Sequence, residues 1–107
     1  MKIQCDCGSI VHDGTDDLPH KAHIIPDQQW NTLFEALDWL IETRCNTAIQ
    51  RDDACNQIRM LITQVARTAW QCSACGRLFI EDNARNLHCY PPGYPDTARE
   101  LLREIPG

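Results

Sequence analysis

Two closely spaced cysteine pairs limit what this chain can fold into more than any other feature of its sequence. The sequence is Cys-Asp-Cys-Gly at residues 5–8 and Cys-Ser-Ala-Cys-Gly at residues 72–76. A tight turn of this kind presents two thiolates to one metal ion, because the glycine tolerates the positive φ that closes the turn. Two such turns would supply a closed tetrahedral set of sulfur ligands, which is typical of structural zinc. The predicted ligands of one structural Zn²⁺ are Cys5, Cys7, Cys72 and Cys75.

A zinc ion at this position would join the two ends of the chain. More than sixty residues separate the two pairs, so the ion would bring Met1–Val11 beside Thr68–Tyr90. With 107 residues, 43% of them hydrophobic, the chain can bury only one modest core. Structural zinc contributes on the order of 10 kcal/mol, comparable with the whole stability of a small domain. The metal is therefore expected to hold the fold together and to take no part in chemistry.

Other interpretations of the cysteines stay open. A redox role for the second pair is disfavoured, because a thioredoxin-type motif opens a helix and here an alternating, strand-like pattern follows. The short first turn is the weaker half of the assignment, and a nearby histidine could replace one of its ligands. Two separate sites are a further alternative, pairing Cys7 or Cys75 with a residue close to it in sequence. The residues that could take part are His12, His20, His23, His88 and Cys89.

The N-terminal residues and the apolar pattern bear on localisation and domain number. The chain begins Met-Lys-Ile-Gln-Cys, without the apolar segment of a signal peptide. No apolar run approaches the roughly 20 residues that span a bilayer. These features predict a cytoplasmic protein with no membrane partner, and seven cysteines in a reducing compartment favour metal binding over disulfides. The length fits a single domain over residues 1–107, with a helical insertion at about 27–67.

The insertion is predicted from helical periodicity and from the absence of glycine and proline between Asp27 and Cys75. One apolar series predicts a helix over 27–44, with Asp27 at its N-terminus and with Trp30 and Phe34 in the core. A second series predicts a helix over about 52–67, with aspartates at 52 and 53 as caps and Cys55 packed as a small hydrophobic residue. Residues 45–51 could form a turn or continue the helix.

Short strands are predicted around both cysteine turns. They cover residues 1–5 and 9–12 at the first turn, and 68–71, 77–81 and 86–90 around and after the second. Residues 13–26 read as an ordered loop, and a short helix is predicted from Asp96 to about Glu104. The predicted fold class is therefore α+β: a split zinc ribbon with an inserted helical pair and a short C-terminal helix.

Acidic residues gather in the first part of the chain. The net charge is −5, and residues 6–42 hold eight acidic side chains against one base, Lys21. Such a surface repels a phosphate backbone, so nucleic acid is not expected as a partner. It favours a protein partner with a basic surface. Trp39, between Asp38 and Leu40, has the chemistry of a binding hot spot, and it could equally cover a small apolar cluster.

Enzymatic activity has little support in the sequence. Histidines and aspartates cluster over residues 12–23, and a small enzyme using this loop is one alternative. No HExxH spacing, phosphate-binding loop, GxGxxG or GxSxG motif accompanies the cluster. The aspartates are better explained as turn and cap residues. A non-catalytic protein is therefore predicted, and a zinc-ribbon regulator or adaptor of transcription or translation is the other alternative, disfavoured by the acidic charge.

Several sequence blocks together resemble small bacterial zinc-ribbon proteins, some of which look like immunity proteins of polymorphic-toxin or contact-dependent inhibition loci. The blocks are the two cysteine turns, Asp-Asp-Leu-Pro-His-Lys-Ala at 16–22, Pro-Asp-Gln-Gln-Trp at 26–30, Trp-Gln at 70–71, Arg-Leu-Phe-Ile at 77–80 and Asn-Leu-His at 86–88. The resemblance implies a protein that binds and neutralises a toxin, and many toxins that act on nucleic acid have a basic cleft. The acidic and aromatic residues then expected to contact the partner are Asp13, Asp16, Asp17, Asp38, Trp39 and Glu42.

Overall fold

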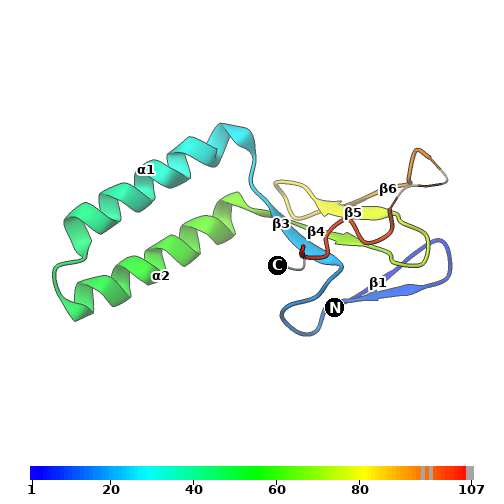
Figure 1. The fold of residues 1–107 in the computed structure, drawn as a ribbon, viewed down its shortest axis with the longest axis horizontal. Helices are drawn as coiled ribbons and strands as arrows, with labels where there is room; N and C mark the ends of the chain where they lie inside the picture. Colours follow the sequence, from blue (N-terminus) through cyan, green and yellow to red (C-terminus); the bar gives the residue numbers. More distant parts are fainter. Residues whose placement is uncertain (95, 97, 106–107) are drawn as a thin grey trace. The chain divides into compact units, whose positions relative to one another are not determined.

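The computed structural model describes residues 1–94, 96 and 98–105 and contains two helices and six strands. The chain divides into two compact units, and Figure 1 shows the helices and strands that they contain. Unit 1 comprises residues 1–23 and 67–107, and unit 2 comprises residues 24–66, which follow the first part of unit 1 and precede the second. The predicted α+β class is confirmed. None of the helices in the described part of the chain is both long and apolar enough to cross a membrane.

Unit 1 is built from two small β-sheets. Strands β1 (Lys2–Gln4) and β2 (Ile10–His12) pair antiparallel, with Ile3 opposite Val11. The second sheet has the order β3-β4-β5-β6, and the pairs β4–β5 and β5–β6 are antiparallel. Its strands are β3 (Lys21–Ile24), β4 (Arg67–Gln71), β5 (Leu78–Glu81) and β6 (Leu87–Tyr90).

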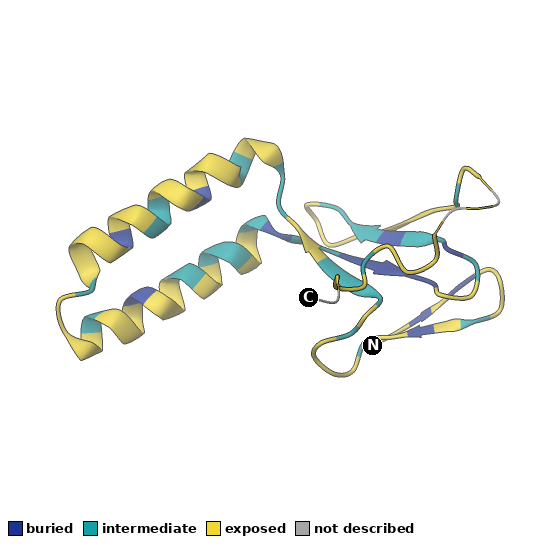
Figure 2. Ribbon diagram, viewed as in Figure 1, coloured by how far each residue is buried: buried dark blue, intermediate teal, exposed yellow. Residues whose placement is uncertain are grey.

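The core of unit 1 joins both sheets around the two cysteine turns. Ile3 and Val11 come from the two-stranded sheet. Trp70 of β4 and Phe79 of β5 lie opposite each other in the four-stranded sheet. Cys5 and Cys72 are buried in the same cluster. The buried positions, dark blue in Figure 2, lie mainly along these strands. Two of the predicted metal ligands are thus part of the hydrophobic core itself.

Two parts of unit 1 differ from the sequence prediction. Residues 21–24 were expected to be loop, but they form β3, whose neighbour in the sheet is β4. The backbone N–H of Gln71 donates to the carbonyl of His20 at 2.9 Å just before β3. The predicted C-terminal helix is wrong for the described residues 98–105, which form turns and bends. Thr97, within its expected first turn, lies outside the described residues.

Unit 2 is a hairpin of two helices, α1 (Asp27–Arg44) and α2 (Ala48–Val65), which pack on each other. The predicted bounds of α1 are confirmed, with Pro26 as its N-cap and Asp27 in its first turn. Residues 45–47 are the turn. The second helix begins at 48, earlier than predicted, because Thr47 caps it: the Thr47 Oγ1 accepts a hydrogen bond from the Gln50 N–H at 3.1 Å. The prediction that the aspartates at 52 and 53 cap the helix is therefore wrong.

The hairpin buries fewer apolar side chains than the sequence predicted. Leu33 and Leu40 of α1 and Ala54 of α2 are buried. Trp30 and Phe34, predicted to be core residues, are each 46% exposed and contact each other edge to face, with ring centroids 5.0 Å apart. Cys55, predicted to pack, is exposed, because Ala54 takes the inward position. Figure 2 shows exposed residues along both helices.

Candidate metal centre

Both cysteine turns of unit 1 are closed by the same two backbone hydrogen bonds. In each turn the N–H of the glycine donates to the carbonyl of the first cysteine, at 3.0 Å for Gly8 and 2.8 Å for Gly76. The N–H of that first cysteine donates to the carbonyl that follows the glycine, at 2.9 Å in both. The glycine φ angles are +94° and +84°, in a backbone region that residues with a side chain rarely adopt. The first turn therefore closes in the same way as the second, although it is one residue shorter.

The four cysteine sulfurs converge on one point. One sulfur from each of Cys5, Cys7, Cys72 and Cys75 lies within 4.8 Å of all the others. Contacts cross between the turns, with Cys5 Sγ 3.5 Å from Cys75 Sγ and Cys7 Sγ 3.7 Å from Cys72 Sγ. These four side chains could therefore bind a metal ion. Since each turn contributes two sulfurs, such an ion would join the N-terminal strands to β4 and β5.

Burial divides the four cysteines into an inner pair and an outer pair. Cys5 and Cys72 are buried in the core, Cys75 is half-buried and Cys7 is exposed. Burial raises the pKa of the Cys5 thiol to about 12, so a nearby cation is needed to hold it as a thiolate at neutral pH. The backbone N–H and the hydroxyl of Ser9 lower the pKa of Cys7 to about 6, which favours its thiolate.

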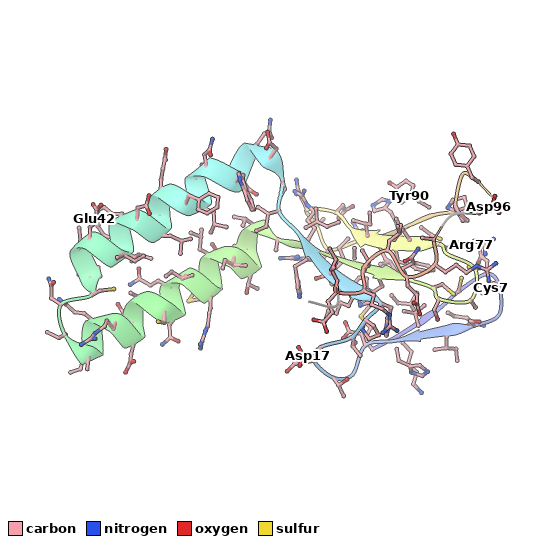
Figure 3. The ribbon with its side chains drawn as sticks, viewed as in Figure 1. Cys7, Asp17, Glu42, Arg77, Tyr90 and Asp96 are labelled. Carbon is pink, nitrogen blue, oxygen red and sulfur yellow. The ribbon has the colours of Figure 1, made fainter. Side chains whose placement is uncertain are left out.

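Arg77 supplies positive charge to the cluster and was not identified from the sequence. Its Nη1 donates to the Cys75 Sγ at 3.3 Å. Burial opposes ionisation of Cys75, but the backbone N–H and the side chain of Arg77 outweigh it, so the pKa of this thiol is lowered. Figure 3 shows Arg77 at the same end of unit 1 as Cys7. The position of a basic residue directly after the turn glycine was the signal available in the sequence.

The alternative ligands named from the sequence lie outside the cysteine cluster. Within residues 1–94, 96 and 98–105, no second group of three or more His, Cys, Asp or Glu side chains converges closely enough to hold an ion. The His20 ring instead contacts the backbone, with its Nε2 2.6 Å from the carbonyl oxygen of His12. His88 contacts Asp82 at 2.8 Å. Cys89 is exposed on β6, opposite Phe79.

Asp13 occupies an internal position in unit 1. Its carboxylate accepts a hydrogen bond from the indole N–H of Trp70 at 2.9 Å and forms an ion pair with Lys21 Nζ at 2.9 Å. The hydrogen bond from Lys21 holds the pKa of this carboxyl below its ordinary value. The carboxylate thus ties the loop after β2 to the core tryptophan that packs with Cys5 and Cys72. The other expected partner contacts are exposed: Asp16 and Asp17 in unit 1, and Asp38, Trp39 and Glu42 in unit 2.

Gln71, directly before the second cysteine turn, fixes the C-terminal segment of unit 1. Its side chain is buried and hydrogen-bonds three backbone groups: the Nε2 donates to the carbonyls of Gly76 and Ala98, and the Oε1 accepts from the N–H of Leu101 at 2.8 Å. A buried amide with its polar atoms satisfied in this way holds its partners in place. The sequence identified the neighbouring cysteine but gave no signal for this contact.

Comparisons of the whole chain with known proteins identify a family. No curated protein and no solved structure gives a significant match. One family model matches residues 1–94, a range that includes both cysteine turns, both helices and all six strands. That model covers most of the chain, which therefore belongs to the family described as a domain of unknown function (DUF8617).

Proposed function

We propose that the four cysteines hold one structural Zn²⁺ and that the chain is a non-catalytic module that binds another protein. The observation that carries the zinc assignment is the convergence of four sulfurs within 4.8 Å of one another. Sulfurs at about 2.3 Å from a tetrahedral zinc are about 3.8 Å apart, close to the crossing contacts of 3.5 and 3.7 Å. A set of four protein ligands leaves no position for a substrate, which suits a structural role.

Metal identity is the first point to test. Tetrahedral sulfur sites take zinc or iron, so elemental analysis of the purified chain distinguishes the two. One zinc per chain is expected, and its loss on mutation of Cys72 but not of Cys55 would tie the ion to the cluster. Cys55 is the matched control because it is exposed on α2 and lies outside the cluster. One iron per chain, or no metal, would contradict the zinc proposal.

A protein-binding role is supported by side chains that are exposed and chemically suited to a partner. Trp39 is 52% exposed on α1, between two exposed acidic residues, Asp38 and Glu42. Tryptophan is enriched at interface hot spots, and acidic groups steer basic partners. Among such modules, we propose an immunity protein that neutralises a bacterial toxin with a basic surface, as the resemblance of its sequence blocks to such proteins suggests.

The immunity role is tested in cells with the toxin candidate encoded beside this chain's gene. Co-expression of the chain should restore growth, and the two purified proteins should form a complex. A variant that loses zinc should fail to protect, because the fold that presents the binding surface is lost. A neighbouring gene product that neither binds the chain nor is neutralised by it would remove the immunity proposal. Elemental analysis would still test the zinc assignment separately.

A further inference from the structure

Helix α1 carries a row of apolar side chains that the hairpin leaves uncovered. Trp30 and Phe34 are each 46% exposed and Ile41 is 61% exposed, while Leu37 between them is half-buried. Their spacing of i, i+4, i+7 and i+11 places them on one face of the helix, beside the face that packs on α2. The α1 stripe is defined as Trp30, Phe34, Leu37 and Ile41.

An acidic row lies directly beside the α1 stripe, on the side away from α2. The acid row is defined as Asp27, Glu35, Asp38 and Glu42, all of which are exposed. At about 100° per residue, the row spans about 80° of the helix surface next to the stripe. In Figure 3 the Glu42 side chain points away from α2. The α1 surface therefore combines an apolar centre with one negatively charged edge.

The charge of the acid row is not neutralised within the hairpin. The ion pairs of the described residues involve other carboxylates, at positions 13, 81, 82 and 100. The basic side chains of the hairpin that are nearest to the row in sequence have other contacts. Arg44 lies over the ring of Trp39, 5.6 Å from its centroid, and Arg51 donates to the carbonyl of Thr47. The carboxylates of the row are thus available to a partner.

We propose that the α1 stripe and the acid row together bind a basic amphipathic helix of a partner protein. This deepens the proposed function, on which it rests, by naming the surface and the chemistry of the partner. From Trp30 to Ile41 the stripe covers about 16 Å, or three turns of helix. A helix of similar length packs its apolar face on the stripe at an axial distance of about 8–10 Å. Lysines or arginines along one edge of that helix then face the acid row.

Charge distinguishes this partner from other occupants of an apolar helix face. In an antiparallel pair of α1 helices from two copies, the two acid rows would run along the same edge and repel each other. Nucleic acids and anionic lipid surfaces carry the same sign of charge as the row. A basic helix instead gains apolar contact and opposite charge on one surface.

The test uses the full-length, metal-loaded chain and a fluorescent synthetic peptide of lysine and leucine. The peptide is designed as an amphipathic helix of about 18 residues, or five turns. A second peptide carries glutamate at every lysine position. Fluorescence anisotropy should show binding of the lysine peptide that weakens as salt is raised, and little binding of the glutamate peptide. Equal binding of the two peptides, or binding of neither, would overturn the proposal.

Variants then locate the binding surface. Phe34→Ser or Ile41→Ser should weaken binding of the lysine peptide by about tenfold or more. The matched controls are Ile49→Ser and Met60→Ser, at apolar α2 positions that are 83% and 62% exposed, and they should change affinity by less than about twofold. Asp38→Lys with Glu42→Lys should weaken binding and its salt dependence, whereas Asp52→Lys on α2 should not. Zinc content and helical circular dichroism verify that each variant is folded.

Each remaining outcome decides between the surface and the function. If the α2 variants weaken binding as much as the α1 variants do, the surface assignment is wrong. If sedimentation equilibrium finds a dimer of the wild-type chain that Phe34→Ser converts to monomer, a second copy occupies the stripe and the proposal falls. If the chain protects cells from a toxin equally well with Phe34→Ser, the surface is wrong while the immunity function stands. If the lysine peptide binds through the stripe but the chain neither binds nor neutralises the neighbouring toxin candidate, the surface stands and the immunity function is removed.

Discussion

Replacing Cys72 with serine is expected to prevent metal binding and to remove a large part of the stability of unit 1. A metal ion bound by Cys7 and Cys72 would close a loop of about 65 residues, and the chain-entropy relation for a cross-link of that length gives about 4 kcal/mol at 25 °C. This is a minimum, because Cys72 is only 2% exposed and its serine hydroxyl would also be buried. A domain of this size has about 5–15 kcal/mol in total.

The expected result is a large shift in thermal unfolding. For a domain of about 100 residues, 1 kcal/mol corresponds to about 4–8 °C in Tm, so Cys72→Ser should lower Tm by about 15 °C or more. Trp70 fluorescence is the readout for unit 1, since this side chain is 2% exposed in its core. A background with Trp30→Phe and Trp39→Phe leaves Trp70 as the single tryptophan.

The control separates loss of the metal from loss of a cysteine. Cys55→Ser, at the exposed α2 position, should retain one zinc and unfold within a few degrees of the parent protein. The wild-type chain in excess chelator should reproduce the lower Tm of Cys72→Ser. If Cys72→Ser melts within about 3 °C of the control, or if chelator leaves the transition in place, the metal does not stabilise this fold and the reasoning is refuted.

Three further predictions test contacts around the cluster. Arg77→Ala should weaken metal binding more than Arg77→Lys does, because lysine keeps a positive charge near the Cys75 sulfur. Competition with a colorimetric chelator measures the metal affinity of each variant, and equal affinities of the two variants would contradict this prediction. Gln71→Leu should release the C-terminal segment, so that trypsin cleaves after Arg99 several times faster than in the parent protein at the same zinc content. An unchanged cleavage rate would show that the hydrogen bonds of Gln71 do not hold this segment. Asp13→Ala should cost about 1–3 kcal/mol in urea unfolding at pH 7, because it leaves the Trp70 indole N–H without its acceptor, whereas Asp16→Ala in the same loop should cost less than about 0.5 kcal/mol. The pKa of Asp13 is lowered in the folded chain, so its contribution is present above its ordinary value of 3.8 and would be lost as the pH falls below it.

The cysteine cluster was largely predictable because its signals are local in sequence. The spacing of each cysteine pair and the glycine after it define a turn that can close without help from distant residues. Once both turns exist, four thiols of matching geometry are available, and their convergence in the structure follows the prediction. What spacing could not reveal was the environment of the sulfurs. The hydrogen bond from Arg77 and the deep burial of Cys5 depend on how the strands pack around the turns.

The sequence alone determined helix α1, because its apolar period and the proline before Asp27 act within the segment itself. The start of α2 shows where local reasoning fails: aspartates at 52 and 53 are good caps by type, but Thr47 ends the turn three residues after α1 and caps the helix first. Strand β3 was missed because a four-residue segment with little alternation becomes a strand only when a neighbour such as β4 is present.

Exposure was decided by the tertiary structure alone. Periodicity places Trp30 and Phe34 on the apolar side of α1, but a helix packed against a single partner buries only the narrow face along Leu33 and Leu40. Which apolar residues become core and which remain at the surface depends on how many elements cover the helix, and this number is not encoded in the helix itself. The sequence therefore determined helix α1 and the four candidate metal ligands, and the packing of the elements determined which side chains remain exposed.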